Sequence, residues 1–222
     1  MHMTFYIGID PSMNSTGIAI MKVDESHVSN SFYILKPDLT KKDVQNEQLL
    51  NDSLDDKTYF KYVTYEKLHT ETEDNHISEY FKTVNMTRIM KAIRDIVYDE
   101  CKNSDENYIV QEGISYGSSL RTKSVYDLAG LNYMLRQQFI NPNPTIDDKF
   151  KMIVATPQNI KKFATGKGNA KKEEIVSNFM KEISEKFTIL KKVDDISDAY
   201  YMAKYAKSLH ESDKYKEIFD NF

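Results

Sequence analysis

The sequence of 222 residues contains a single cysteine, Cys101, so an internal disulfide is excluded. It also lacks a Cys-x-x-Cys pair or a Cys/His cluster, either of which would predict a zinc site. No run of about 18 apolar residues is present, and the sequence therefore predicts no membrane span. A secretory signal is absent as well, so we expect a cytoplasmic protein without a disulfide framework.

An excess of positive charge is also lacking. The 30 Lys and Arg residues against 34 Asp and Glu residues give a net charge of -4. A polyanion such as DNA is therefore not expected to bind over the whole surface, and a nucleic-acid partner requires a local basic patch. One candidate patch is the segment 161–172, KKFATGKGNAKK, which contains five lysines and two glycines.

Apolar runs and amphipathic segments alternate along the chain, which predicts one α/β domain spanning residues 1–222. We expect a mixed sheet of five strands flanked by helices, in which an antiparallel meander is followed by parallel strands. Strands are expected at 6–10, 17–23, 31–35, 108–112 and 150–155. Helices are expected at 78–101, at 123–139, after Thr156-Pro157, at 173–187 and at 195–209. Residues 36–77 are polar and break the pattern, so we predict an insertion containing at most a short strand or helix.

Carboxylates stand at the ends of two predicted strands and on one helix face. Asp10 ends the first strand, Glu112 ends the fourth, and Asp195 and Asp198 lie three residues apart on the last helix. If the first and fourth strands are parallel neighbours, their acids emerge at one carboxyl edge, where ligands bind in open α/β sheets. Acids gathered there would repel one another, and divalent cations that prefer oxygen ligands relieve such repulsion.

Two Mg²⁺ ions about 3.5 to 4 Å apart can clamp the attacking and leaving oxygens of a phosphodiester. This chemistry needs only carboxylates and water, and the sequence offers no Ser/His/Asp or Cys/His alternative. Each acid alone also suits a plainer role. Asp10 suits a turn, Glu112 a strand end, and Asp194, Asp195 or Asp198 a helix cap, for which Asp194 is the best candidate. Their joint placement is what favours a metal site.

Four motifs in chain order resemble those of the RuvC-type Holliday junction resolvases, which belong to the ribonuclease H-like nucleases. They are Gly8-Ile9-Asp10-Pro11 with Thr16-Gly17, then Ile109-Val110-Gln111-Glu112, then Lys161, Gly166, Gly168, Ala170 and Lys172, and finally Asp195, Asp198 and Ala199. The resemblance implies a ribonuclease H-like fold, a homodimer, and Mg²⁺-dependent paired nicks in four-way DNA junctions. With its insertion at about 36–77, the chain looks more like a divergent phage or viral resolvase than a compact bacterial one.

The resemblance implies that Asp10, Glu112, Asp195 and Asp198 bind two Mg²⁺ ions and act in catalysis. Mn²⁺ is expected to substitute, and no small-molecule cofactor is expected. On physical grounds we expect Asp10 to bridge the two ions and Lys172 to neutralise charge that develops in the transition state. DNA contacts are expected from Lys161, Lys162, Lys167, Lys171, Lys172, Tyr116 and Arg121.

Other interpretations stay open. The lysine segment also suits an exposed helix face, and the apolar face of helix 123–139 suits either a dimer interface or ordinary core. The chain could be a ribonuclease H-like nuclease that acts on flaps, forks or RNA. It could also be a catalytically silent DNA-binding or virion protein on the same fold. The four acids disfavour the last hypothesis, because a silent protein has no reason to bear their repulsion.

Overall fold

A computed structural model describes the chain except for residues 1, 26, 70–73, 115–122, 141–148 and 220–222. Its strands form one mixed sheet in the order β4-β3-β2-β1-β5-β6. The antiparallel meander consists of β1 (Thr4–Asp10), β2 (Thr16–Val23) and β3 (Val28–Lys36), and β5 (Glu106–Glu112) and β6 (Phe150–Ala155) continue the sheet in parallel with β1. The prediction of a mixed sheet with a meander and parallel strands, flanked by helices, is confirmed.

The predicted number of five strands is wrong, because the segment 36–77 contributes a sixth. β4 (Thr58–Thr64) pairs in parallel with β3, and α1 (Lys41–Asn51) precedes it. The segment therefore contains both a strand and a helix, more than the sequence predicted. Apolar periodicity could not reveal α1, since that helix buries Asn46 and Leu50 but exposes Val44 and Leu49.

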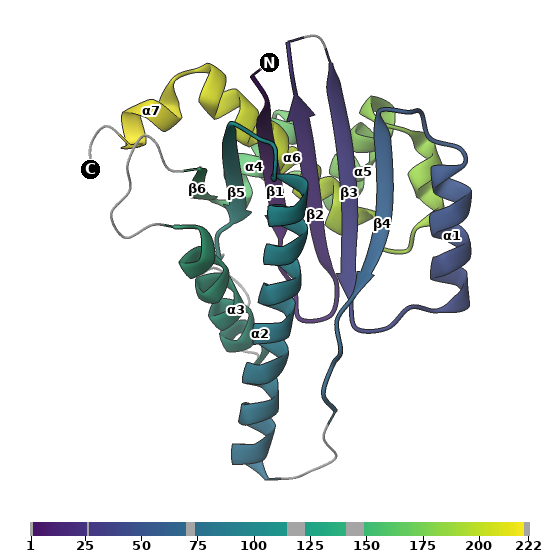
Figure 1. Cartoon of the computed structure of the whole chain (residues 1–222), viewed down its shortest axis with the longest axis vertical. Helices are drawn as coiled ribbons and strands as arrows, with labels where there is room; N and C mark the ends of the chain where they lie inside the picture. The colour runs from purple at the N-terminus through teal and green to yellow at the C-terminus, as the bar shows by residue number, and fades with distance from the viewer. Residues whose placement is uncertain (1, 26, 70–73, 115–122, 141–148, 220–222) are drawn as a thin grey trace.

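Helices cover both faces of the sheet and enclose two separate cores (Figure 1). Side chains alternate along a strand, so Ile7 and Ile9 pack under one set of helices whereas Tyr6 packs under the other. The first set is α2 (Asn75–Glu100) and α3 (Lys123–Phe139). The second set includes α4 (Pro157–Thr165), α5 (Lys172–Glu182), the 3₁₀ helix Glu185–Ile189 and α6 (Val193–Glu211), which α7 (Lys214–Phe219) follows.

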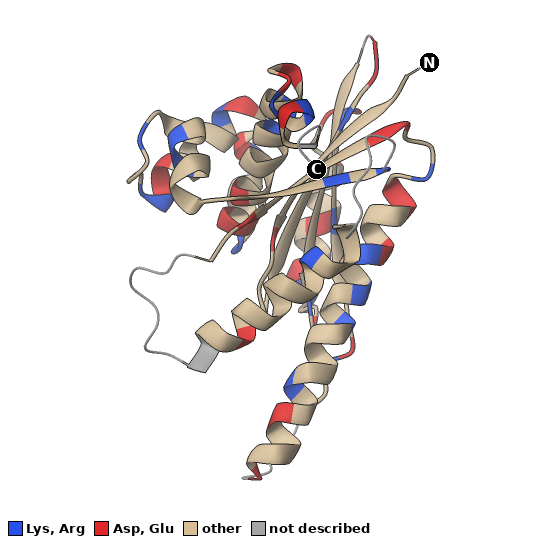
Figure 2. Cartoon of the chain, turned by 90° about the vertical axis from the view of Figure 1, so that its left-hand side faces the viewer, with Lys and Arg blue, Asp and Glu red and all other residues tan. Residues whose placement is uncertain are grey.

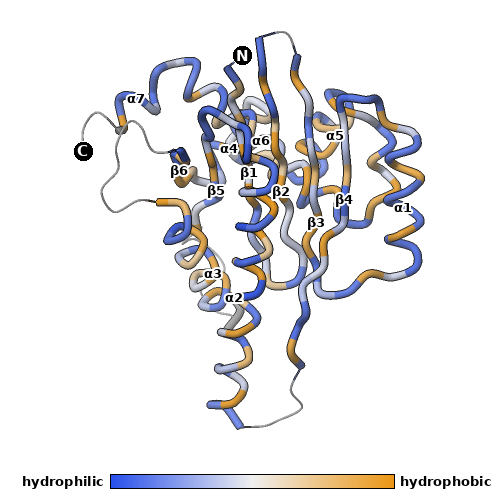
Figure 3. Tube along the Cα trace, in the orientation of Figure 1, coloured by the Kyte–Doolittle hydropathy of each residue, from blue (hydrophilic) through white to orange (hydrophobic). Residues whose placement is uncertain are grey.

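The surface and core residues of the long helices follow their sequence patterns. In α2 hydrophobic residues recur at intervals with hydrophilic ones between them (Figure 3), and acidic and basic residues are interspersed along the same helix (Figure 2). In α3, Leu131, Leu135 and Phe139 are buried in the core, so the apolar face of this helix packs on the sheet. None of the helices in the described part of the chain is long and apolar enough to cross a membrane.

Two glycines let α6 approach the sheet unusually closely. A Cβ atom at Gly8 in β1 would lie 1.8 Å from the carbonyl oxygen of Ala199, and one at Gly17 in β2 would lie 2.1 Å from that of Asp195. Since real Cβ atoms do not come so close to backbone, only glycine fits at either position. Gly17 is paired with Asp10 in the sheet, so this contact holds the first turns of α6 beside the end of β1.

Candidate active site

Asp10 and Glu112 end neighbouring parallel strands on the same face of the sheet. β1 and β5 are paired in register through the residues immediately before these two acids. Two residues earlier in each strand, Gly8 lies against α6 and Val110 belongs to the core beneath that helix. Because side chains two apart point to the same face, both acids are directed to the α6 side of the sheet. The sequence predicted a shared carboxyl edge but not the face.

The two acids also line one hollow at this edge. Its volume is about 190 Å³, and α3 contributes Val125, Leu128 and Asn132 to its lining. The side chain of Asn132 is buried and donates from Nδ2 to the carbonyl oxygen of Leu128 at 2.9 Å. The hollow is therefore a partly apolar recess whose ionisable groups are the carboxylates of Asp10 and Glu112.

The helix acids reach the same neighbourhood from α6. Asp195 is buried, and its Oδ2 accepts a hydrogen bond from the hydroxyl of Ser15 at 2.5 Å. Asp198 lies one turn further along and is partly exposed. Its charge acts on both Asp10 and Glu112. The close contact between α6 and the two strand glycines thus brings side chains separated by more than 180 residues together.

Burial and neighbouring negative charges raise the pKa values of the acids at this site. Burial raises the pKa of Asp10 well above its usual range, and the charges of Asp198, Glu112 and Asp195 raise it further. Burial followed by the charge of Asp198 raises the pKa of Glu112 to about 7. Burial also raises the pKa of Asp198 to about 6, although Lys172 opposes the shift. The pKa of Asp195 is raised by burial against the hydrogen bond from Ser15. Hydrogen bonds and nearby positive charges therefore do not fully offset the cost of ionising these four acids.

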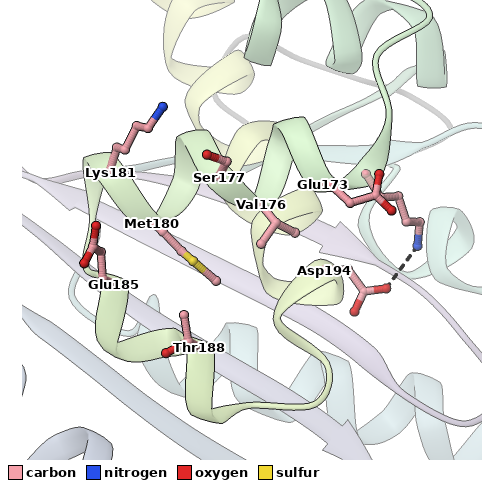
Figure 4. A pocket seen from close by; sticks show the side chains of 9 residues that line it. Glu173, Val176, Ser177, Met180, Lys181, Glu185, Thr188 and Asp194 are labelled. Carbon is pink, nitrogen blue, oxygen red and sulfur yellow. Dashed lines mark hydrogen bonds and ion pairs between the residues drawn. The ribbon is translucent and has the colours of Figure 1, made fainter.

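Two of the predicted lysines face these acids. Lys172, at the start of α5, donates from Nζ to Oδ2 of Asp194 at 3.1 Å, and the dashed line at Asp194 in Figure 4 marks this contact. Burial lowers the pKa of Lys172, but the bond to Asp194 and the charges of Asp198 and Asp10 outweigh it and raise the pKa. The charge of Lys161 on α4 lowers the pKa of both Glu112 and Asp198. The charges of both lysines thus act on acids of the site.

The other predicted DNA contacts are less closely tied to the acids. Lys162, Lys167 and Lys171 are exposed, and Lys167 lies 3.7 Å from a carboxylate oxygen of Glu174. Within the segment, Gly166 ends α4 in the left-handed conformation, with φ of 79°, so termination of a helix accounts for this glycine. The two remaining predicted contacts, Tyr116 and Arg121, lie outside the described residues.

The prediction that Asp194 caps the last helix is wrong. The N-cap of α6 is Lys192, and no side-chain hydrogen bond caps this helix. Asp194 instead pairs with Lys172 from the first turn of α6. Sequence reasoning also missed Ser15 and Asn132. Ser15 stands just before the predicted Thr16-Gly17 motif, and Asn132 is a polar residue inside an apolar helical run, so both positions offered a weak indication.

The donor set suits a divalent cation that prefers oxygen, since all four acids are carboxylates with raised pKa values. Among the described residues, no three His, Cys, Asp or Glu side chains are gathered closely enough to form a ready-made metal cluster. Mg²⁺ usually keeps several waters and takes only one or two protein carboxylates. Asp10 and Glu112, which share the hollow, are two carboxylates that suit this mode of binding.

The raised pKa values predict a stability that depends on pH in metal-free buffer. A carboxyl group whose pKa is higher in the folded than in the unfolded state does not lower stability below its unfolded pKa, because it is protonated in both states. As the pH rises from the unfolded pKa through the folded pKa, stability is lost. For Glu112 this loss falls between about pH 4 and pH 7. We therefore expect Glu112→Gln to stabilise the protein by roughly 1–3 kcal/mol at pH 8 in EDTA, and to change little at pH 4.

Thermal or urea unfolding at both pH values measures this difference. The matched control is Glu185→Gln, which changes an exposed acid of the 3₁₀ helix and should alter stability little at either pH. A Glu112→Gln protein less stable than the unsubstituted chain at pH 8 would show that the ionised carboxylate is compensated within the protein.

Comparisons with known proteins give similarity only at the level of structure. No family model matches the chain, and no curated protein sequence matches it. The structure of Thermus thermophilus RuvC is 13% identical, with a TM-score of 0.48, over 93% of this chain and 96% of that one. T. thermophilus RuvC in complex with a Holliday junction substrate is 11% identical, with a TM-score of 0.43, over 94% and 95%. The human cytomegalovirus terminase nuclease domain is 13% identical, with a TM-score of 0.34, over 91% and 82%.

Proposed function

We propose that this chain is a divalent-metal-dependent endonuclease that cuts branched DNA, four-way junctions foremost, by paired nicks. The observation that carries the proposal is the placement of Asp10 and Glu112 on one hollow at the carboxyl edge of β1 and β5. The charges of Asp195 and Asp198 on α6 act on Asp10, and those of Lys161 and Lys172 act on Glu112 and Asp198. Crowded, under-compensated acids are costly to a fold. A functional site that recruits divalent cations gives a reason to retain them.

In this proposal Asp10, Glu112, Asp195 and Asp198 hold the cations, with Asp10 central because the other three acids all act on its charge. Bound Mg²⁺ or Mn²⁺ would supply an activated water and stabilise the charge on the phosphodiester. Ser15 orients the carboxylate of Asp195 through its hydrogen bond. The recess behind Asp10 and Glu112 is lined partly by Val125 and Leu128, so its wall on the α3 side is partly apolar.

The lysines give the site its affinity for a phosphate backbone. The chain as a whole is acidic, with a net charge of -4, so the positive groups at 161–172 have to concentrate the DNA at this edge. Lys161 and Lys172 act on the acids themselves, which favours a position beside the scissile phosphate. Lys162, Lys167 and Lys171 would bind the flanking backbone. A homodimer, which would supply two such sites for paired nicks, is part of the proposal.

The test is to incubate the protein with a labelled mobile four-way junction, a flap and a plain duplex, in Mg²⁺, Mn²⁺ or EDTA. Symmetric nicks confined to the junction, and absent in EDTA, are the expected result. Equal cutting of the flap would replace junction resolution by a broader branched-DNA nuclease activity. Tight binding of all three substrates without cutting in either metal would contradict the proposal and favour a catalytically silent DNA-binding protein.

Lys172→Ala is expected to slow cleavage more than it weakens binding. A cation that meets developing charge is worth about 100-fold or more in rate, whereas loss of one phosphate contact should weaken binding by less than about tenfold. Single-turnover cleavage and junction binding in Ca²⁺ measure the two effects separately. Lys171→Ala is the matched control, because its neighbouring exposed side chain should affect binding alone. Equal losses of rate and affinity in Lys172→Ala would reduce this residue to a backbone anchor.

A further inference from the structure

The outer edge of β4 is occupied by side chains of α1. β4 stands at one end of the sheet order, and Figure 1 shows α1 running beside it. An edge strand normally presents unpaired N–H and C=O groups to which another strand can bind. Here the backbone N–H of Phe60 donates to Oδ1 of Asn51 at 3.0 Å, and Nδ2 of Asn51 donates to the carbonyl oxygen of Phe60 at 2.8 Å. One side-chain amide thus makes both hydrogen bonds that a neighbouring strand would make.

The outward N–H groups on either side of Phe60 in β4 are hydrogen-bonded as well. The backbone N–H of Tyr62 donates to Oε2 of Glu47, one turn before Asn51 in α1, at 2.6 Å. Toward the N-terminus of β4, the N–H of Thr58 donates to the carbonyl oxygen of Asp55 at 3.2 Å. Three alternate N–H groups of β4 are therefore engaged by the segment that precedes the strand, and a second strand would find them occupied.

The face of α1 that is turned toward the domain consists mainly of side chains that can form hydrogen bonds. The residues that face the domain recur at helical spacing and are mostly polar: Asp43, Asn46, Glu47, Leu50 and Asn51. Asp43 lies 2.8 Å from Nζ of Lys36, and Nδ2 of Asn46 donates to the carbonyl oxygen of Ile189 at 3.0 Å. Leu50 is the one fully buried apolar residue of the helix. A helix packed on a sheet face needs an apolar stripe, whereas a helix packed on a strand edge needs hydrogen-bonding groups.

We infer that α1 takes the place of a further strand, and that it prevents β4 from pairing with β4 of a second copy of this chain. β4 has the sequence TYFKYVT, whose aromatic and β-branched residues favour strand pairing. An identical strand is the natural partner for a free edge, because antiparallel pairing of two such edges satisfies both through a twofold axis. The inference assigns a role to the insertion at 36–77 and is independent of the proposed nuclease activity.

The test compares the double variant Glu47→Ala/Asn51→Ala with the control Gln45→Ala/Gln48→Ala, which removes two exposed polar side chains from the same helix. Amide hydrogen exchange reports on Phe60 and Tyr62, and sedimentation velocity over a range of concentrations reports on association. We expect exchange at these two amides to become about tenfold faster or more in dilute solution. At high concentration we expect species larger than those of the unsubstituted chain, with renewed protection of the β4 amides.

The control variant should match the unsubstituted chain in both measurements. Unchanged exchange at Phe60 and Tyr62 in the Glu47/Asn51 variant, or no larger species at any concentration, would overturn the inference. If the double variant does not fold, the unsubstituted chain and the single variants Glu47→Gln and Glu47→Ala decide. Glu47→Gln keeps an acceptor for Tyr62 and should retain protection that Glu47→Ala loses. Fast exchange of the Tyr62 amide in the unsubstituted chain would refute the edge role.

Discussion

Asp10→Asn is expected to lower the rate of junction cleavage by more than about 100-fold while the protein stays folded and still binds DNA. Loss of a group that merely supports a metal ligand typically costs 10- to 100-fold, and Asp10 is proposed as the central ligand itself. Asn keeps the shape of the side chain but removes the charge on which the other three acids act. Removing that charge relieves repulsion, so folding should not suffer.

Single-turnover cleavage of a labelled four-way junction, with binding measured in Ca²⁺, checks this expectation. The matched control is Asp38→Asn, an exposed aspartate that follows β3. Because β3 runs parallel to β1, this control lies beyond the same edge of the sheet as Asp10 but should cut normally. An Asp10→Asn protein that cuts at the unsubstituted rate would leave the strand-end acid with only a structural role.

Of the proposed substitutions, Gly8→Ala is expected to lower the free energy of unfolding the most. The added Cβ atom would lie 1.8 Å from the carbonyl oxygen of Ala199 and 2.7 Å from the backbone nitrogen of Ala203. Backbone cannot rotate away as a flexible side chain can, so α6 would have to move off the sheet. Overpacking typically costs about 1–3 kcal/mol and occasionally more, and two contacts with backbone atoms place Gly8→Ala at the upper end of that range. Displacing α6 would also carry Asp195 and Asp198 away from Asp10, so cleavage should fall as well.

Urea unfolding of Gly8→Ala against Gly130→Ala measures the effect with a matched control. Gly130 lies inside α3, and among the described residues a Cβ atom there would meet only Met86, with the sulfur at 3.4 Å. Since alanine is favoured over glycine within a helix by about 1 kcal/mol, this control should be neutral or stabilising. A Gly8→Ala protein as stable as the unsubstituted chain would mean that α6 does not pack on β1 as closely as described.

The sequence contained enough information for the central part of the sheet and for the acids at its edge. Tyr6 to Ile9 and Tyr108 to Val110 are short apolar runs that end in acids, which is how two buried neighbouring strands present ligands at a carboxyl edge. The parallel pairing of β1 with β5 places the two acids that end these strands next to each other. Whether these acids bind metal and catalyse stays a prediction.

What the sequence could not predict depends on contacts between distant residues. α1 has hydrogen-bonding residues on its inner face because it packs on a strand edge. A search for periodic apolar residues does not detect such a helix. Asp194 has the position of a cap, but its partner Lys172 lies 22 residues earlier on another helix. Likewise Ser15 meets Asp195 across 180 residues, which no local pattern indicates.

Anomalous diffraction from crystals soaked in Mn²⁺ is the most direct test of the claim that these carboxylates hold divalent cations. The account predicts at least one manganese peak at the carboxyl edge of β1 and β5, within coordination distance of Asp10 and of Glu112 or Asp198, and its loss in Asp10→Asn. A map with no manganese at this edge under saturating Mn²⁺ would contradict the account.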